Sequence, residues 1–173
     1  MMILGLSGSL RAASTNTALL RAAAAGPQKI RVFDGLAGLP AFSPDLEGDL
    51  TPQVVLDFAA AVASADGLIV ACPEYVHALP GAFKNALDWL VSREELTDKP
   101  IALLHASHRG EDVLADLRRI LATVSSRFAP EIFARFVLNG QSPEQVAATM
   151  RMPAQAEALR GFLEQFRQFV AAT

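Results

Sequence analysis

Short apolar runs alternate with longer stretches of helical periodicity along the chain. The apolar runs predict strands over residues 2–6, 29–33, 67–72, 101–106 and 132–137. Apolar positions that recur three and four residues apart predict helices over residues 14–25, 52–64, 80–90, 110–124 and 154–171. Pro52 is expected at the first helical position after a Thr51 cap, and a short helical turn is expected near Pro143. Residues 35–51, with two prolines and three glycines, predict a loop.

This alternation predicts an α/β fold. The run over residues 67–72 is wholly apolar, as a parallel strand buried on both faces must be. Strands that alternate with helices favour a right-handed, doubly wound, five-stranded parallel sheet with helices on both faces, and residues 1–173 are expected to form one domain. Such sheets bind ligands at the carboxyl ends of their strands, which points to loops 7–16, 73–80 and 107–110.

Composition narrows the function classes. Hydrophobic residues make up 51% of the chain and charged residues 19%, so a full core can form, and the formal net charge of −3 argues against nucleic-acid binding. No apolar run reaches the roughly 20 residues of a membrane span, and the start of the chain lacks a signal-peptide pattern, so we expect a cytoplasmic protein.

Cysteine and histidine usage gives no sign of a disulfide or a metal site. Cys72 is the single cysteine, lies in an apolar run and is expected to be a buried core residue. The three histidines lack the spacing of metal ligands. The sequence contains no G-x-S-x-G motif, which argues against a serine hydrolase. His105 is expected in the core, and His77 has no assigned role.

Loop 7–16 combines hydroxyl, amide and guanidinium groups at the start of a helix. Ser9, Ser14 and Asn16 can donate hydrogen bonds to phosphate oxygens, and Arg11 can add a charge-assisted bond. Gly8 would let the backbone approach a ligand closely. Alternatively, Ser14 only caps the helix and Ser9 only turns the chain. The loop matches neither a Walker motif nor G-x-G-x-x-G, which favours a mononucleotide phosphate.

Loop 73–80 is bracketed by Pro73 and Pro80 and carries Tyr75. A planar ring system needs flat walls and backbone groups that read its edge, and Tyr75 with the backbone of residues 73–77 could supply both. Ordinary packing of Tyr75 is the competing interpretation.

Together the two loops resemble the NAD(P)H-dependent FMN reductase family, which includes quinone, chromate and azo-dye reductases. The resemblance is carried by two motifs, Gly8-Ser9-Leu10-Arg11-x-x-Ser14-x-Asn16 and Pro73-Glu74-Tyr75-x-x-x-x-Pro80-Gly81-x-x-Lys84-Asn85-Ala86-Leu87-Asp88-Trp89. It implies a flavodoxin-like fold, FMN as cofactor, and hydride transfer from NADPH or NADH through the flavin to a small-molecule acceptor such as free flavin or a quinone. No side chain is then required as a catalytic acid, base or nucleophile.

The resemblance also implies roles for particular residues. Ser9, Arg11, Ser14 and Asn16 would hold the FMN phosphate. The isoalloxazine ring would be lined, mainly through the backbone, by Pro73, Glu74 and Tyr75. Val76, Ser107 and His108 are also expected among the cofactor-binding residues. Family members usually form dimers or tetramers, which places the helix with Lys84, Asp88 and Trp89 near a subunit contact; a solvated Lys84–Asp88 pair is the alternative.

The chain departs from the family pattern at two places. Val76 stands where Asn is common, and residues 107–112 replace a segment that is often rich in glycine. His108 and Arg109 could stabilise negative charge on reduced flavin or receive a nicotinamide phosphate, or they could be ordinary surface residues. These departures keep a second interpretation open, a non-catalytic flavin-binding electron carrier or redox sensor that acts with a partner protein.

Overall fold

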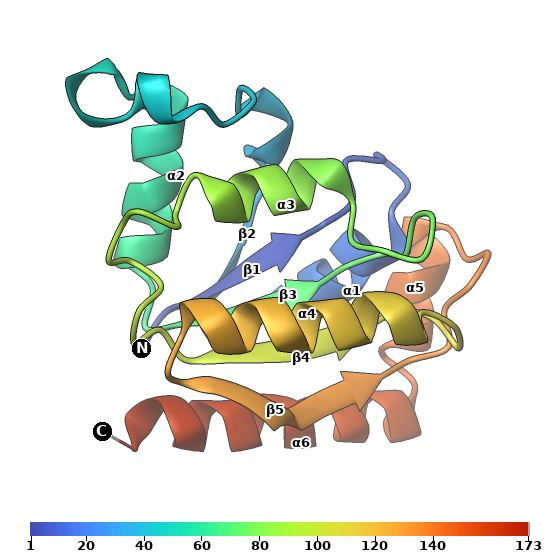
Figure 1. Cartoon of the computed structure of the whole chain (residues 1–173). Helices are drawn as coiled ribbons and strands as arrows, with labels where there is room; N and C mark the ends of the chain where they lie inside the picture. Colours follow the sequence, from blue (N-terminus) through green and yellow to red (C-terminus); the bar gives the residue numbers. More distant parts are fainter. Residues whose placement is uncertain (173) are drawn as a thin grey trace.

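A computed structural model describes residues 1–172 and contains one five-stranded parallel sheet (Figure 1). The strands run in the order β2-β1-β3-β4-β5, so the chain passes from β2 across β1 to reach β3. This is the flavodoxin-like strand order, so the predicted fold class is confirmed. The strand bounds are β1 Ile3–Ser7, β2 Ile30–Phe33, β3 Gly67–Ala71, β4 Ile101–His105 and β5 Phe128–Arg135.

Three helices cover each face of the sheet. One layer holds α2 (Gln53–Ala63), α3 (Gly81–Asp88) and α4 (Glu111–Val124), and the other holds α1 (Thr15–Ala24), α5 (Pro143–Thr149) and α6 (Pro153–Ala171). Right-handed crossovers place α1, between β1 and β2, on one face. The chain then reverses its direction across the sheet, so α2, α3 and α4 lie together on the other face.

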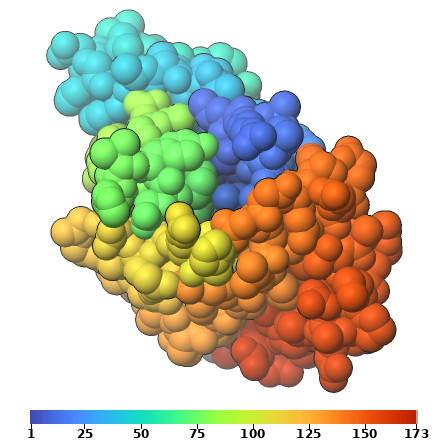
Figure 2. All heavy atoms as spheres, turned by 90° about the vertical axis from the view of Figure 1, so that its right-hand side faces the viewer, coloured from blue at the N-terminus to red at the C-terminus, as the bar shows by residue number. Residues whose placement is uncertain are grey.

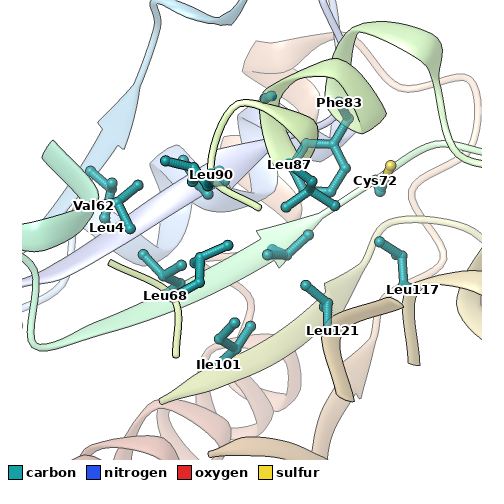
Figure 3. Close-up of a cluster of buried hydrophobic side chains, with 14 of the residues drawn as sticks. Leu4, Val62, Leu68, Cys72, Phe83, Leu87, Leu90, Ile101, Leu117 and Leu121 are labelled. Carbon is teal, nitrogen blue, oxygen red and sulfur yellow. The ribbon is translucent and has the colours of Figure 1, made fainter. Parts of the chain in front are cut away.

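The central strands β1, β3 and β4 are buried along their whole length, and successive side chains point to opposite faces. Leu4, Leu68 and Ile101 pack toward α2, α3 and α4, together with Phe83 and Leu117 (Figure 3). The residues next to them pack toward the other layer. Full burial of one leucine or isoleucine contributes about 1.5–3 kcal/mol, which explains why these strands have no polar face.

Strand β5 begins four residues before its predicted start at Ile132 and ends at Arg135 rather than Val137. Pro130 and Glu131 interrupt its apolar pattern, and the pairing with β4 contains a bulge there. Ile101 of β4 pairs with Phe128 of β5, and Leu103 pairs with Phe133, so a step of two residues along β4 lies opposite a step of five along β5. The pairing partner, rather than the local sequence, sets where this strand begins.

Two other boundaries differ from the prediction. Helix α2 begins at Gln53 with Pro52 as its N-cap, so Thr51 lies outside the helix. The segment 35–51 contains three short 3-10 helices rather than an irregular loop, Leu36–Gly38, Pro44–Leu46 and Gly48–Leu50. The turn expected near Pro143 is α5, whose Ser142 and Gln145 form a capping box.

Within residues 1–172, no helix combines the length and the apolar character that crossing a membrane requires.

Candidate functional site

The three loops singled out by topology meet at the carboxyl edge of the sheet. Figure 2 views this edge, where the segments near residues 10, 76 and 108 lie beside one another, in blue, green and yellow. Gly8 N–H donates to the carbonyl oxygen of Ala71 at 2.9 Å, which ties the start of loop 7–16 to the end of β3. The site is therefore assembled from segments about 65 and 100 residues apart in sequence.

The start of α1 presents polar groups that the protein itself does not use. Ser14 is the buried N-cap, and its Oγ accepts the Thr17 N–H at 3.2 Å, so its own O–H can still donate. In residues 1–172, the N–H groups of Thr15 and Asn16 have no acceptor. Asn16 is 7% exposed, and its Oδ1 is buried with no hydrogen-bond partner in this part of the chain. Asn16 Oδ1 is an acceptor, whereas the two N–H groups and the Ser14 O–H are available donors at a helix N-terminus, which suits an anion.

The outer part of loop 7–16 is organised by serine hydroxyls. Ser7 Oγ accepts the Ser9 N–H at 3.3 Å and shares a 2.7 Å hydrogen bond with Thr17, and Ser9 Oγ accepts the Arg11 N–H at 3.4 Å. The Arg11 guanidinium is exposed and has no acidic partner among the described side chains. Ser9 thus helps to turn the chain while its own O–H can still donate, and Arg11 remains available for a ligand.

A small cavity of about 140 Å³ lies beside this loop. Ser9 and Arg11 line it, with Phe33 and Asp34 on the far wall, whereas Ser14 and Asn16 do not. Pockets that enclose a ligand usually measure about 300–1,000 Å³. A ligand of nucleotide size would therefore rest on the open edge of the sheet rather than inside this cavity.

Gly8 is required by packing as well as by any ligand. A Cβ at residue 8 would overlap the Sγ of Cys72, which lies 1% exposed beneath the loop. Burial raises the pKa of the Cys72 thiol well above its ordinary value. The thiol stays protonated and is a poor nucleophile, so Cys72 is the core residue that the sequence predicts.

Loop 73–80 contains a tight two-residue turn in an uncommon conformation. Tyr75 and Ala78 exchange backbone hydrogen bonds of 3.0 and 3.1 Å, and Val76 and His77 between them have φ of +52° and +57°. Left-handed conformations at both central positions are those of a type I′ turn, which favours Asn and Gly. Val76 is 95% exposed and Tyr75 51%, so the turn projects its apolar tip from the edge.

Two side-chain contacts fix this turn to the start of α4. Glu74 accepts the Val113 N–H at 3.0 Å, and His77 Nδ1 lies 2.6 Å from an Asp112 carboxylate oxygen. The hydrogen bond to Asp112 and the charges of Asp112 and Glu74 raise the pKa of His77. Side-chain oxygen and nitrogen atoms of Glu74, His77 and Asp112 lie within 4.8 Å of one another. The ion pair between His77 and Asp112 and the bond from the Val113 N–H to Glu74 already satisfy these atoms. His77, to which the sequence assigned no role, thus attaches the turn of loop 73–80 to the start of α4.

Loop 107–110 is held from the side by Asn139, which follows β5. Asn139 Nδ2 donates to Ser107 Oγ at 2.9 Å, and its Oδ1 accepts the His108 N–H at 3.1 Å and lies 2.9 Å from His108 Nδ1. Ser107 Oγ also accepts the Arg109 N–H at 3.0 Å. Sequence reasoning missed Asn139, because it lies more than thirty residues from its partners and outside any motif.

The same loop is held from below by His105, the last residue of β4. Its ring is 1% exposed, and Nε2 is hydrogen-bonded to the carbonyl oxygen of Arg109, while Nδ1 is buried with no partner in the described structure. Burial lowers the pKa of His105, and the hydrogen bond to Arg109 opposes this only in part. The ring is therefore neutral with its proton on Nε2. His105 is the core residue that was predicted, and Arg109 is exposed above it.

The second half of the long motif performs a structural task. Asn85 Oδ1 accepts the Phe42 N–H at 2.7 Å, and its Nδ2 donates to Pro40 O at 2.9 Å. Trp89 Nε1 donates to the same Pro40 oxygen at 2.8 Å. These bonds fasten the segment 35–51 to α3. Lys84 and Asp88, the pair given as the alternative interpretation, form an ion pair one turn apart on the same helix.

Comparison with known proteins places the chain in a family. The profile of the NADPH-dependent FMN reductase family matches residues 1–136. The NADH:(hydroxy)cinnamate reductase subunit CrdA of Vibrio ruber is 39% identical over 103 residues, which cover 57% of this chain and 48% of that protein. A 2-hydroxy-1,4-benzoquinone reductase of a Burkholderia species is 43% identical over 84 residues, which cover 47% and 45%. The chain thus spans about half the length of these relatives.

A solved structure agrees with the fold. The flavoenzyme NAD(P)H:(acceptor) oxidoreductase FerB from Paracoccus denitrificans superposes with a TM-score of 0.74 at 23% identity, over 98% of this chain and 97% of that one. The profile match covers most of the chain and includes β1, β3, β4 and the three loops at their carboxyl ends. The chain belongs to the NADPH-dependent FMN reductase family.

Proposed function

We propose that this protein is an FMN-dependent oxidoreductase that takes hydride from NADPH or NADH and passes electrons to a small acceptor such as a flavin or a quinone. The observation that carries the proposal is the set of unused donors at the start of α1, the N–H groups of Thr15 and Asn16 and the Ser14 hydroxyl, beside the open carboxyl edge. Family membership supports the same cofactor.

The residues present fit a flavin phosphate. The N–H groups of Thr15 and Asn16 and the Asn16 side-chain amide, whose oxygen and nitrogen can exchange places by a flip, would bind its oxygens. The hydroxyls of Ser9 and Ser14 would add hydrogen bonds. Arg11 would contribute a charge-assisted bond, since no acidic side chain in residues 1–172 competes for it.

The ring of the flavin would be held by two preformed loops. The backbone from Pro73 to Val76 is fixed by the turn hydrogen bonds and by the Glu74 contact to α4, and Tyr75 offers an exposed aromatic face. Ser107 and His108 would face the ring from the other side, held by Asn139. A loop that is ordered before the ligand arrives loses little entropy on binding.

Bound FMN would supply the hydride and electron exchange between a nicotinamide and the acceptor. The chain itself binds and orients. Arg109 is an exposed cation within loop 107–110 and would attract a nicotinamide phosphate. The edge has no enclosing lid in the described residues, so several flat acceptors would reach it.

Three further properties belong to the proposal. Residues 1–173 would act as one domain, the protein would work in the cytoplasm, and it would form a homodimer or homotetramer. The face of α3 that carries Lys84 and Asp88 is the surface we assign to the subunit contact, because the exposed Val91 follows three residues after the end of this helix.

The test is an absorbance spectrum of the purified protein after reconstitution with FMN, followed by anaerobic addition of NADPH and then NADH. A bound yellow chromophore that bleaches, and turnover when a benzoquinone is added, support the proposal. Bound flavin that neither nucleotide bleaches would favour the carrier or sensor. A protein that takes up no FMN would overturn the proposal. The double variant Arg11→Ala/Asn16→Ala should lose FMN, while Arg119→Ala on α4 serves as the matched control.

A further inference from the structure

A second concavity lies in the other helix layer. Three helices, α1, α5 and α6, surround a groove of about 780 Å³. Its floor is apolar and contains Met150, Leu159 and Leu163, all buried beneath its surface. No residue of loops 7–16, 73–80 or 107–110 lines it, and Arg21 is the one lining residue that it shares with the small cavity beside loop 7–16.

The groove exists because the helices meet through alanines. Ala22 on α1, Ala147 on α5 and Ala156 on α6 are half-buried and form its walls. Larger side chains at these positions would fill the space between the helices. The volume falls within the range of about 300–1,000 Å³ that is typical of small-molecule sites.

The charges on the rim have one predominant sign. Arg151 and Arg160 are exposed, and neither has an acidic partner among the side chains the structure describes. Arg21 also lines the groove and is paired with Asp34 at 3.3 Å. Glu144 is the one acidic residue of the lining. Since the chain as a whole carries a net charge of −3, these unpaired cations are a local feature rather than a reflection of the overall composition.

We propose that this groove binds an amphipathic anion, a molecule with an apolar body of drug-like size and one carboxylate head. The body would lie against the half-buried alanines of the walls, Ala22, Ala147 and Ala156, and burial of their exposed surface removes it from water. The head would bind the Arg151 and Arg160 guanidinium groups, whose planar donors match a carboxylate. Acyl-chain acids and aromatic acids share this chemistry, and the experiment distinguishes the two sources.

The experiment is calorimetric titration of the FMN-reconstituted protein with dodecanoate and, separately, with 2-naphthoate. Dodecanol, which has the same chain without the charge, tests the role of the head. Ala156→Trp fills the groove, and Arg151→Gln/Arg160→Gln removes its charge. The matched controls are Ala115→Trp, exposed on α4, and Arg31→Gln, which is exposed and likewise lacks an acidic partner in residues 1–172.

We expect binding of one anion per chain, and whichever acid binds identifies the source of the ligand. Loss of each guanidinium bond should weaken binding about 10-fold. Ala156→Trp should weaken it at least as much, both controls should bind like the wild type, and all variants should retain FMN. If Ala156→Trp does not fold, the arginine variant decides.

Three results would overturn the inference: no binding of either acid, equal binding of dodecanol, or undiminished binding by the arginine variant. The inference would also be overturned if light scattering gave Ala156→Trp half the mass of the wild-type protein, because a second copy of the chain would then cover the groove. None of these outcomes depends on whether the carboxyl-edge site reduces an acceptor, so the two proposals fail separately.

Discussion

The imidazole of His105 occupies the space that a side chain at Gly110 would need. A Cβ at residue 110 would lie 2.7 Å from both Cε1 and Nε2 of the ring, and Gly110 has a φ of +105°. The buried histidine and the left-handed glycine therefore depend on each other, and together they bring loop 107–110 back over the end of β4.

Replacing Gly110 with Ala should destabilise the protein by about 2–4 kcal/mol, because left-handed strain of about 1–2 kcal/mol adds to an overpacking cost of similar size. Urea unfolding measures the loss. Gly140→Ala is the control, since Gly140 also has a positive φ (+75°) but no atom within 4 Å of its added Cβ. Equal losses for the two variants would show that the His105 contact contributes nothing.

His105 should make stability fall in mild acid. Its folded-state pKa is lowered by burial, so the unfolded chain binds the proton first, near the ordinary value of about 6.5. The free energy of unfolding should therefore decrease as pH falls below about 6.5. His105→Gln, which can keep a donor toward Arg109 O, should lose this part of the pH dependence. A wild-type and a variant profile of the same shape between pH 7 and 5 would contradict the assignment.

His77 should act with the opposite sign. Its folded-state pKa is raised by Asp112, so the ion pair stabilises the fold fully below the unfolded pKa of about 6.5 and is lost as pH rises through the folded pKa. The difference in stability between wild type and His77→Asn should shrink over this interval. Because both side chains are largely exposed, the change should be small and should fade in high salt. Asp112→Asn should abolish it.

Val76→Asn should stabilise the protein by about 1 kcal/mol, because asparagine tolerates the left-handed conformation that valine adopts at a cost. Thermal unfolding checks this prediction. Val137→Asn is the control, as Val137 is exposed and is not among the residues with positive φ in the described chain. If Val76→Asn lowered the melting temperature, the strain assigned to this turn would be wrong.

Asn16→Ala should separate ligand binding from stability. The Asn16 side chain makes no hydrogen bond within residues 1–172, so its removal should leave the melting temperature almost unchanged while FMN binds about 10-fold more weakly. Ser14→Ala should affect both, since the cap to Thr17 is worth about 1 kcal/mol. Flavin fluorescence titration gives the affinities. A large loss of stability in Asn16→Ala with unchanged affinity would assign Asn16 to the fold alone.

The sequence predicted the strands that are buried on both faces, because burial demands an unbroken apolar run, as in β3. It also predicted which loops meet, since topology fixes the carboxyl edge. It could not predict where β5 starts, because pairing with β4 stabilises Pro130 and Glu131 in a strand that their own propensities oppose.

The contacts that shape the site were equally hidden. Glu74 meets Val113, His77 meets Asp112, and Ser107 meets Asn139, each across more than thirty residues. Local patterns report periodicity and caps, whereas these contacts depend on how loops from different strands are brought together. The roles of Ser14 and His105 were accessible because a helix cap and a buried strand position have local signatures.

The interruption in β5 also governs how the sheet ends. β5 is an outer strand, and an outer strand with a regular row of free N–H and C=O groups is a template on which strands of other molecules can assemble. Pro130 has no N–H to offer, the exposed Glu131 adds charge, and the bulge breaks the repeat. The irregularity that prevented prediction of the first half of β5 thereby protects the protein against edge-to-edge aggregation.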